Sequence, residues 1–539
     1  MPWHNSLPVV LLSALCLGEP ALAANTSESF EPAVQVVSGK LAGVRPDGSS
    51  NTIAFLGIPY AAPPLGPLRW RPPRPAPKWH GLREATHYGP ACPQLRASWL
   101  PFIGWNEDCL YLNVWTDNLE GNTGLTPVIV YFHGGSNSAG YSQLNPIGPA
   151  LSPLGVVVVS ANYRLGALGF LAHPALSAES PHRSSGNYGL MDQLQVLKWV
   201  RENISRFGGD PRQVTVMGQS AGAVDICLLM TSPMASGLFQ RAIMESGDCQ
   251  GSLNQTLRTP VRYNGLSETA EAAGERLVAE LAVPHEGSTL EWLRSVPAPE
   301  LLNVWGRHRD IQLGAIVDGW TIPEQPAKRF SEGKAIAIAV LVGSNADEAT
   351  VFGHGGPATI ENFREYMTSD TGPFAALEYA IYRPASEADV PIRYLQLQND
   401  SFAYGALSMA RTVAAHGRQS YLYLFTYAES GKRSALGAYH GEELYFLSDT
   451  FPVGWQVDET DAALGKAIRS YWVQFARTGN PNGAGAPEWP AYSTEADDSM
   501  SLGRAIHRAP VGVQVNALRR VMNQVLIAAG AIGPTNHPK

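Results

Sequence analysis

The sequence predicts an α/β fold in which a large, mostly parallel sheet is flanked by helices. The first observation is a series of short apolar runs typical of buried strands, including 128–132, 156–161 and 214–217. The second is that segments with helical spacing of apolar residues lie between these runs, as in 187–207. Strand–helix alternation of this kind favours parallel strands with helices on both faces of the sheet.

The composition indicates a globular chain and excludes several classes of function. The chain has 539 residues, enough for a large core, and 16% of them are charged, which is less than usual. The formal net charge is −8, without a long run of like charges. We therefore expect no nucleic-acid partner. Beyond the N-terminus no segment is long and apolar enough for a membrane helix, so we expect no membrane span.

The first 23 residues are predicted to be a signal peptide. Leu7 to Leu17 is an apolar run of the appropriate length, and Ala21-Leu22-Ala23 fits a cleavage site. The segment before the run has no Lys or Arg, but the run is too short for an uncleaved anchor that spans a bilayer. We expect cleavage after Ala23 and a secreted or periplasmic protein.

Export would leave four cysteines in an oxidising compartment, where disulfides can form. Cys92 and Cys109 flank a short loop rich in Trp and Pro, so we predict that they are paired. Cys227 lies seven residues into the predicted helix after Ser220, and we expect a buried thiol there. Cys249 has no evident partner, so both are predicted to be free thiols.

The remaining elements follow from the same patterns. Apart from two helical insertions, about 250–335 and 350–420, we find no boundary that would divide residues 24–539 into separate domains. The insertions are predicted to cap the sheet. In order, the expected elements are short antiparallel strands in 33–58, strands 110–115, 128–132 and 156–161, a helix in 187–207, strand 214–217, helix 223–230, strands 241–245, 337–342 and 421–427, and helices 461–478 and 513–527.

One tight turn carries the first indication of chemistry. Gly218-Gln219-Ser220-Ala221-Gly222 stands between a predicted strand and a predicted helix. A serine on such a turn is exposed at the strand end, and the glycines permit a strained backbone. Ligands of parallel sheets bind at these carboxyl ends, so Ser220 is a candidate nucleophile.

A serine nucleophile needs a base, and usually a histidine that is oriented by a carboxylate. His440 lies in a loop after a predicted core strand, and it is favoured over the other histidines that follow the turn, namely His308, His354, His416 and His507. Asp347 and Glu348 follow another core strand, and composition does not decide which of them is the acid.

The oxyanion of such a reaction needs backbone N–H groups that converge on one point. The glycine turn His133-Gly134-Gly135-Ser136 follows a predicted strand and supplies such groups. The amide of Ala221, directly after the nucleophile, is expected to supply another.

Taken together, these motifs resemble those of the type-B carboxylesterase and cholinesterase family of α/β-hydrolases. The similarity covers almost all of the chain after the signal peptide. It rests on Phe55 to Ala61, Asn106 to Val114, His133 to Gly135, Asn162 to Gly166, Gly186 to Gln193, Phe207 to Pro211, the turn at Ser220, Gly343 to Glu348 and the loop of His440. It implies the α/β-hydrolase fold with a large central sheet and helical capping insertions.

Position by position, the resemblance implies a catalytic triad. Ser220 would be the nucleophile and His440 the base. The family's acid is the glutamate that follows the aspartate, which implies Glu348. The oxyanion donors would be the amides of Gly135, Ser136 and Ala221, although the family usually has glycine or alanine at the second of these positions.

The resemblance also implies several supporting features. Ser246 matches a serine that lies near the acid, and the pair Cys92–Cys109 matches a family disulfide. The usual second disulfide would need a partner shortly after Cys249, and because none exists here, that disulfide is expected to be absent. Arg69 with Glu107 and Arg164 with Asp192 resemble structural ion pairs of the family.

The activity implied is hydrolysis of a small-molecule carboxylic ester through an acyl-enzyme, with no cofactor and no metal. The sequence contains no zinc-ligand spacing and no dinucleotide fingerprint. Two alternatives remain: an amide or carbamate hydrolase with the same triad, and a non-catalytic binding protein on the same fold. Members of the latter kind have lost triad residues, whereas all three are present here.

The type of ester is partly constrained. Cholinesterases hold a quaternary ammonium with a tryptophan of the first disulfide loop and a glutamate before the nucleophile. Here the residue before Ser220 is the neutral Gln219, and the loop is shorter. We expect Trp99 and Trp105 to pack under that loop, and the substrate to be a neutral ester.

Overall fold

A computed structural model describes residues 32–46, 51–97, 100–101, 103–119, 124–250, 254–261, 268–281, 288–352, 356–371, 374–429, 434–483 and 485–511. The predicted signal peptide, the predicted helix 513–527, Trp99 and His354 lie outside these residues. The chain divides after Glu31 into two units, and the description below concerns the second.

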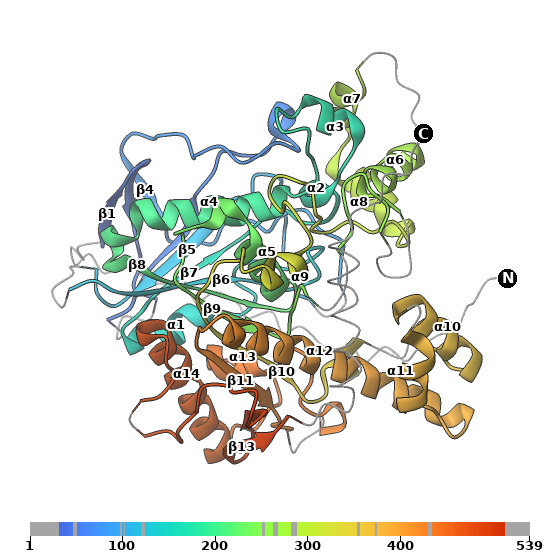
Figure 1. Ribbon diagram of the computed structural model, residues 1–539. Helices are drawn as coiled ribbons and strands as arrows, with labels where there is room; N and C mark the ends of the chain where they lie inside the picture. Colours follow the sequence, from blue (N-terminus) through green and yellow to red (C-terminus); the bar gives the residue numbers. More distant parts are fainter. Residues whose placement is uncertain are drawn as a thin grey trace. The chain divides into compact units, whose positions relative to one another are not determined.

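The core is a ten-stranded sheet with the order β13-β12-β11-β10-β9-β8-β6-β7-β5-β3, visible in Figure 1. The strands from β12 to β7 in this order pair in parallel, and β13, β5 and β3 are attached antiparallel. The predicted mostly parallel α/β sheet is confirmed. The strands are β3 (Ile53–Pro59), β5 (Tyr111–Thr116), β6 (Thr126–Phe132), β7 (Val157–Ala161), β8 (Gly209–Gln219), β9 (Arg241–Glu245), β10 (Ala339–Asn345), β11 (Ser420–Phe425), β12 (Asp498–Leu502) and β13 (Ile506–Pro510).

Helices cover both faces of this sheet, as Figure 1 shows. On one face, α4 (Tyr188–Asn203), α5 (Ala221–Thr231) and α12 (Val390–Ala415) contribute to the larger apolar cluster. On the other, α1 (Ile147–Leu151), α13 (Glu443–Ser448) and α14 (Glu459–Thr478) contribute to a second cluster. Because the parallel strands are buried on both sides, they read as continuous apolar runs, and this made them recognisable in the sequence.

The N-terminal strands form a second, smaller sheet. It has the order β1-β2-β4, with β1 (Ala33–Val36), β2 (Gly39–Ala42) and β4 (Leu82–Glu84). The pair β1–β2 is antiparallel, as expected from the alternating pattern in residues 33–58, and β2 pairs with β4 in parallel. The other strand of that range, β3, joins the edge of the large sheet.

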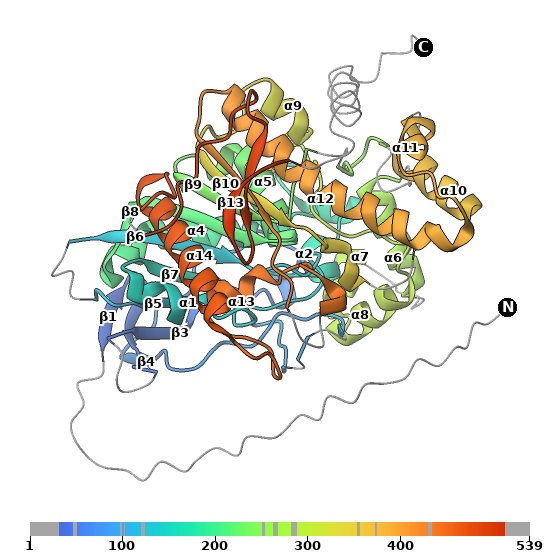
Figure 2. The same cartoon turned by 90° about the horizontal axis from the view of Figure 1, so that it is seen from below.

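The two predicted insertions have different structures. Residues 250–335 contain α6 (Ala270–Glu280), α7 (Thr289–Ser295), α8 (Ala298–Arg307) and α9 (Pro326–Ser331), and α6 to α8 share a separate apolar cluster with α2 (Gly166–Phe170) and α3 (Pro174–Glu179). Within 350–420, α10 (Ile360–Thr371) and α11 (Ala375–Ile381) lie beside the N-terminal end of α12 (Figure 2). The rest of α12 packs against β10 and β11, so it belongs to the sheet's own layer of helices.

The structure contains two disulfides. Cys92–Cys109 is present as predicted, with 5.0 Å between the Cα atoms. The prediction that Cys227 and Cys249 are free thiols is wrong, because they form a second disulfide with a Cα–Cα distance of 5.7 Å. The partner of Cys249 precedes it in the sequence, because the β8–α5–β9 crossover lays α5 over the strands and brings Cys227 to the end of β9.

In the part of the chain that the structure describes, no helix combines the length and the apolar character needed to cross a membrane.

Candidate active site

The turn from β8 to α5 presents Ser220 at the carboxyl edge of the sheet. Ser220 has a φ of 55° and a ψ of −125°, an unfavourable backbone conformation for a residue with a side chain. The hydrogen bond from its amide to the carbonyl oxygen of Glu245, at 2.8 Å, ties the turn to β9. The strained turn places the hydroxyl at the start of a helix, as the sequence predicted.

Each glycine of the turn is explained by a close approach. A Cβ atom on Gly218 would lie 2.6 Å from the carbonyl carbon of Gly222. A Cβ atom on Gly222 would overlap the carbonyl oxygen of Phe132, the last residue of β6. The helix that follows Ser220 therefore packs directly on the strand that leads into the predicted oxyanion turn, and only glycine fits at either position.

The structure brings the predicted base and acid together. His440 Nδ1 lies 2.5 Å from Glu348 Oε2, and Glu348 is completely buried. The other carboxylate oxygen accepts the amide N–H of Asn345 at 2.8 Å. Asp347, the alternative acid, instead accepts the amide N–H of Ala438. Glu348 thus fixes the histidine ring with its Nδ1–H as donor, which leaves Nε2 as the atom that can accept a proton.

The other histidines in the described residues have different surroundings. His308 pairs with Glu280 at 3.2 Å, and His416, which directly follows α12, contacts the carbonyl oxygen of Thr412 in that helix through Nδ1. His507 is exposed on β13.

The electrostatic surroundings of His440 favour a charged ring. Burial by itself would lower the pKa of His440, but the carboxyl groups of Glu348 and Glu443 act in the opposite direction. The net result is a pKa above the ordinary value for histidine. Burial, together with the charge of Glu443, also raises the pKa of Glu442 to about 9, so that side chain is neutral at pH 7.

The residue before Ser220, the third member of the predicted triad, contacts the base. His440 Nε2 lies 3.1 Å from Gln219 Nε2, the side-chain nitrogen of the residue that precedes the nucleophile. Among the hydrogen bonds of the described residues, none joins the Ser220 hydroxyl to His440. Such contacts are often long in free enzymes and tighten when substrate binds.

The predicted oxyanion turn has an unusual backbone. Gly135, Ser136 and Asn137 have φ values of 108°, 55° and 53°, so three consecutive residues lie in the left-handed range. Successive amides in such turns can converge on an anion. Because only the first of the three is glycine, the strain at the other two must be offset by surrounding contacts.

One such contact is a buried network that the sequence analysis missed. Asn137 Nδ2 donates to Asp225 Oδ1 at 2.8 Å, and Gln193 Nε2 donates to Asp225 Oδ2 at 2.6 Å. Asp225 lies on α5, so the network joins the predicted oxyanion turn to the helix that follows Ser220. Burial raises the pKa of Asp225 to about 7, against the two hydrogen bonds that lower it. The signal in the sequence was a single carboxylate among the apolar residues of this helix.

The hydroxyl of Ser246, which was expected near the acid, makes no hydrogen bond to Glu348. Its hydroxyl is buried and has no hydrogen-bond partner among the described residues. Its amide donates to the carbonyl oxygen of Gly343 at 2.8 Å, and its φ is 55°. In this structure Ser246 connects β9 to β10 through its backbone.

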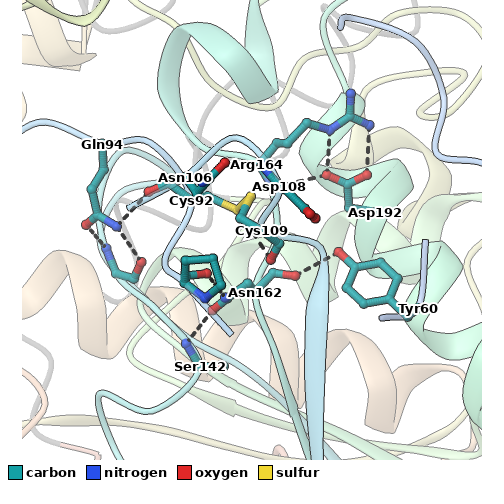
Figure 3. The surroundings of a disulfide bond; sticks show 12 residues. Tyr60, Cys92, Gln94, Asn106, Asp108, Cys109, Ser142, Asn162, Arg164 and Asp192 are labelled. Carbon is teal, nitrogen blue, oxygen red and sulfur yellow. Dashed lines mark hydrogen bonds and ion pairs between the residues drawn. A yellow bond between two sulfur atoms is a disulfide. The ribbon is translucent and has the colours of Figure 1, made fainter. Parts of the chain in front are cut away.

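The first disulfide loop is attached to the segment that follows the predicted oxyanion turn, and Figure 3 shows Gln94 near the Cys92–Cys109 disulfide. Gln94, two residues after Cys92, accepts the amide N–H of Gly140 at 2.8 Å and donates to its carbonyl oxygen at 2.9 Å. The two predicted ion pairs are confirmed nearby. Arg69 binds Glu107 at 2.5 Å, and Arg164 binds Asp192 at 2.7 Å, with side chains that are largely buried.

Aromatic side chains border the base. The rings of Phe352 and Phe402 lie 5.0 and 5.3 Å from the ring of His440, measured between centroids. Phe352 is 58% exposed, and it follows Glu348 in the same short helical turn, Glu348–Phe352. Trp105, in the first disulfide loop, packs against the apolar cluster of α2, α3 and α6 to α8, as expected from the sequence.

Comparison with known proteins identifies one family over almost the whole chain. The model of the carboxylesterase family matches residues 30–519. The chain belongs to the carboxylesterase family. The esterase is 37% identical to the fumonisin B1 esterase of Sphingopyxis macrogoltabida over 493 residues, which cover 87% of this chain and 86% of that protein. It is 34% identical to the para-nitrobenzyl esterase of Bacillus subtilis, covering 88% and 95% of the two chains.

The fold agrees equally well with solved structures. The esterase superimposes on the carboxylesterase of Geobacillus stearothermophilus with a TM-score of 0.77 at 31% identity, covering 91% of this chain and 99% of that one. It is therefore an α/β-hydrolase that hydrolyses carboxylic esters as a serine hydrolase.

Proposed function

We propose that the esterase cleaves its substrate through an acyl-enzyme on Ser220. The Oγ atom attacks the ester carbonyl carbon while Nε2 of His440 takes its proton, and the same proton then passes to the leaving alcohol as the C–O bond breaks. In the second half of the reaction a water molecule attacks the acyl carbon while Nε2 of His440 takes its proton. The bond to Ser220 Oγ then breaks, His440 returns the proton to Oγ, and the acid is released.

The observation that carries this proposal is the contact between His440 Nδ1 and the buried Glu348 at 2.5 Å. It orients the ring with Nε2 directed to the turn of Ser220, where Gln219 contacts it. The amides of Gly135, Ser136 and Ala221 are proposed as oxyanion donors, because the first two lie in the left-handed turn and the third begins α5.

The test is Ser220→Ala. We expect ester turnover to fall by several orders of magnitude with unchanged thermal unfolding, because removing a triad member leaves only binding and the oxyanion site. A folded variant with turnover close to that of the wild type would contradict the mechanism. Matched ester and amide substrates in the same assay would reveal an amidase if amides were turned over as fast as esters.

We further propose that the substrates are uncharged esters with an apolar group next to the base. The support is local: Gln219 is neutral, and the rings of Phe352 and Phe402 flank His440. Apolar and aromatic side chains with few polar groups are typical of small-molecule sites.

We also propose that the esterase is exported, with cleavage after Ala23. The support is the apolar run in residues 7–17 together with the two disulfides, since disulfides persist in secreted and periplasmic proteins and are rare in the cytosol.

A further inference from the structure

The side chain of Gln219 lies between the proposed base and the oxyanion turn. It is 5% exposed, although it precedes a nucleophile that solvent must reach. Its Nε2 atom is 3.1 Å from His440 Nε2. At its other end, a Cβ atom on Gly134 would lie only 2.7 Å from Gln219 Oε1. The amide therefore fills the space between the turn of residues 133–136 and the histidine ring.

The chemistry of the two side chains decides which is the donor. Since His440 Nδ1–H donates to Glu348, the ring nitrogen Nε2 presents a lone pair. The Gln219 amide nitrogen carries only protons, so it donates to that lone pair. This is the lone pair that must receive the Ser220 proton, so in this structure the amide occupies the position that the hydroxyl needs during the reaction.

We propose that Gln219 is a positioning residue, which holds the neutral His440 ring in its resting orientation and yields Nε2 to the Ser220 hydroxyl when an ester binds. The inference rests on the proposed role of His440 as the base. It assigns to Gln219 a contact with the base and none with the ester.

The charges around His440 explain why an amide suits this position. Carboxyl groups act on the ring from the turn of Glu348 and from Glu443, the first residue of α13. Glu442, which precedes α13, has a pKa raised to about 9 and is neutral at pH 7. The aromatic neighbours Phe352 and Phe402 carry no charge. A further carboxylate about 3 Å from Nε2 would bind the imidazolium and disfavour the neutral ring that accepts the proton. The neutral Gln219 amide, which donates a hydrogen bond to Nε2, instead favours the neutral ring.

The experiment compares Gln219→Glu and Gln219→Met with the wild type. The measurements are kcat/KM for an uncharged ester between pH 5 and 9, and the rate of inactivation by an uncharged phosphonate, which also requires a neutral base. Rates are normalised to the sites that the phosphonate titrates, so a misfolded fraction does not affect them. Gln35→Glu is the matched control, because it places the same charge on an exposed residue of β1.

We expect Gln219→Glu to move the acid limb of both profiles upward by about one pH unit or more, while the plateau at high pH stays within several-fold. Gln219→Met keeps the length of the side chain but cannot donate a hydrogen bond, so it should move the acid limb upward by less. The control Gln35→Glu should leave the acid limb at the wild-type pH. If the acid limbs of both Gln219 variants coincide with that of the wild type, the proposed role of Gln219 is overturned. That result would not contradict the proposed triad. If Ser220→Ala retained turnover, the proposed function itself would fail.

Discussion

Glu348 is the single residue whose replacement should affect the site most. Its carboxylate is completely buried, so its charge is stabilised only by the groups that donate hydrogen bonds to it. Its oxygens accept from Asn345 and from His440. Removing its charge without changing its shape would alter both the orientation of the ring and its affinity for a proton.

We therefore expect Glu348→Gln to reduce kcat by roughly 10⁴, the size of effect seen when a triad histidine is held in the wrong tautomer. In the wild type the raised pKa of His440 means that activity is lost as pH falls through a midpoint above about 6.5. In the variant this midpoint should move downward, since the first carboxylate that favours the imidazolium is gone.

The measurement is kcat and kcat/KM as a function of pH on both proteins. Glu365→Gln, at an exposed position of α10, removes the same charge and should change neither value. An acid limb that stays in place in Glu348→Gln would mean that this carboxylate does not set the protonation of the base.

The position of helix α5 in the site is held by one hydrogen-bond network and one disulfide. The helix carries the proposed nucleophile at its N-terminus, Asp225 in its second turn and Cys227 two residues after Asp225. Asp225 binds the oxyanion turn, and Cys227 is bonded to the segment that follows β9.

Asn137→Ala should test the first of these connections. It removes one of the two donors to the buried Asp225, so we expect a loss of about 1–3 kcal/mol in the free energy of unfolding. Because Asn137 also holds the strained turn, kcat should fall more than KM rises. Denaturant unfolding and steady-state kinetics would measure the two effects, with the exposed Asn362→Ala on α10 as the control. If Asn137→Ala and Asn362→Ala unfold with the same free energy, the hydrogen bond from Asn137 to Asp225 does not stabilise the fold.

The disulfides can be tested by counting thiols. In exported protein whose chain begins at Ala24, we expect no free thiol after denaturation without reductant, because all four remaining cysteines are paired. Each loop closure is expected to stabilise the fold by ~3 kcal/mol. Two free thiols would contradict the pair Cys227–Cys249, and a chain that still begins at Met1 would contradict export.

The sequence could predict those elements whose pattern is local. The buried parallel strands are apolar throughout, and the turn at Ser220 has its glycines at fixed positions, so both were found to within a few residues. The pair Cys227–Cys249 and the link from Asn137 to Asp225 could not be predicted, because they depend on how α5 crosses from β8 to β9. The contact of Gln219 with His440 joins residues that are 221 positions apart.

For the whole molecule, the distribution of charge around the site determines which esters are favoured. With the neutral Gln219 before the nucleophile, we expect little gain in kcat/KM for a choline ester over its uncharged isostere. A desolvated cation over an aromatic face can contribute ~2 kcal/mol, so a cation site would be easily detected. A hundredfold preference for the choline ester, ~2.7 kcal/mol, would contradict the proposed preference for neutral substrates.

The long separations within the site also bear on how the chain acquires activity. Glu348 and His440 are 92 positions apart in the sequence. Glu348 follows β10 and His440 follows β11, and these two strands pair with each other. Both strands come long after β8, the strand that leads into the turn of Ser220, in the sequence. Contacts of such high sequence separation close late, since the loop entropy must be overcome first. Recovery of ester hydrolysis during refolding therefore reports completion of the parallel sheet, whereas the Cys227–Cys249 pair, separated by 22 residues, can form while the chain is still largely unfolded.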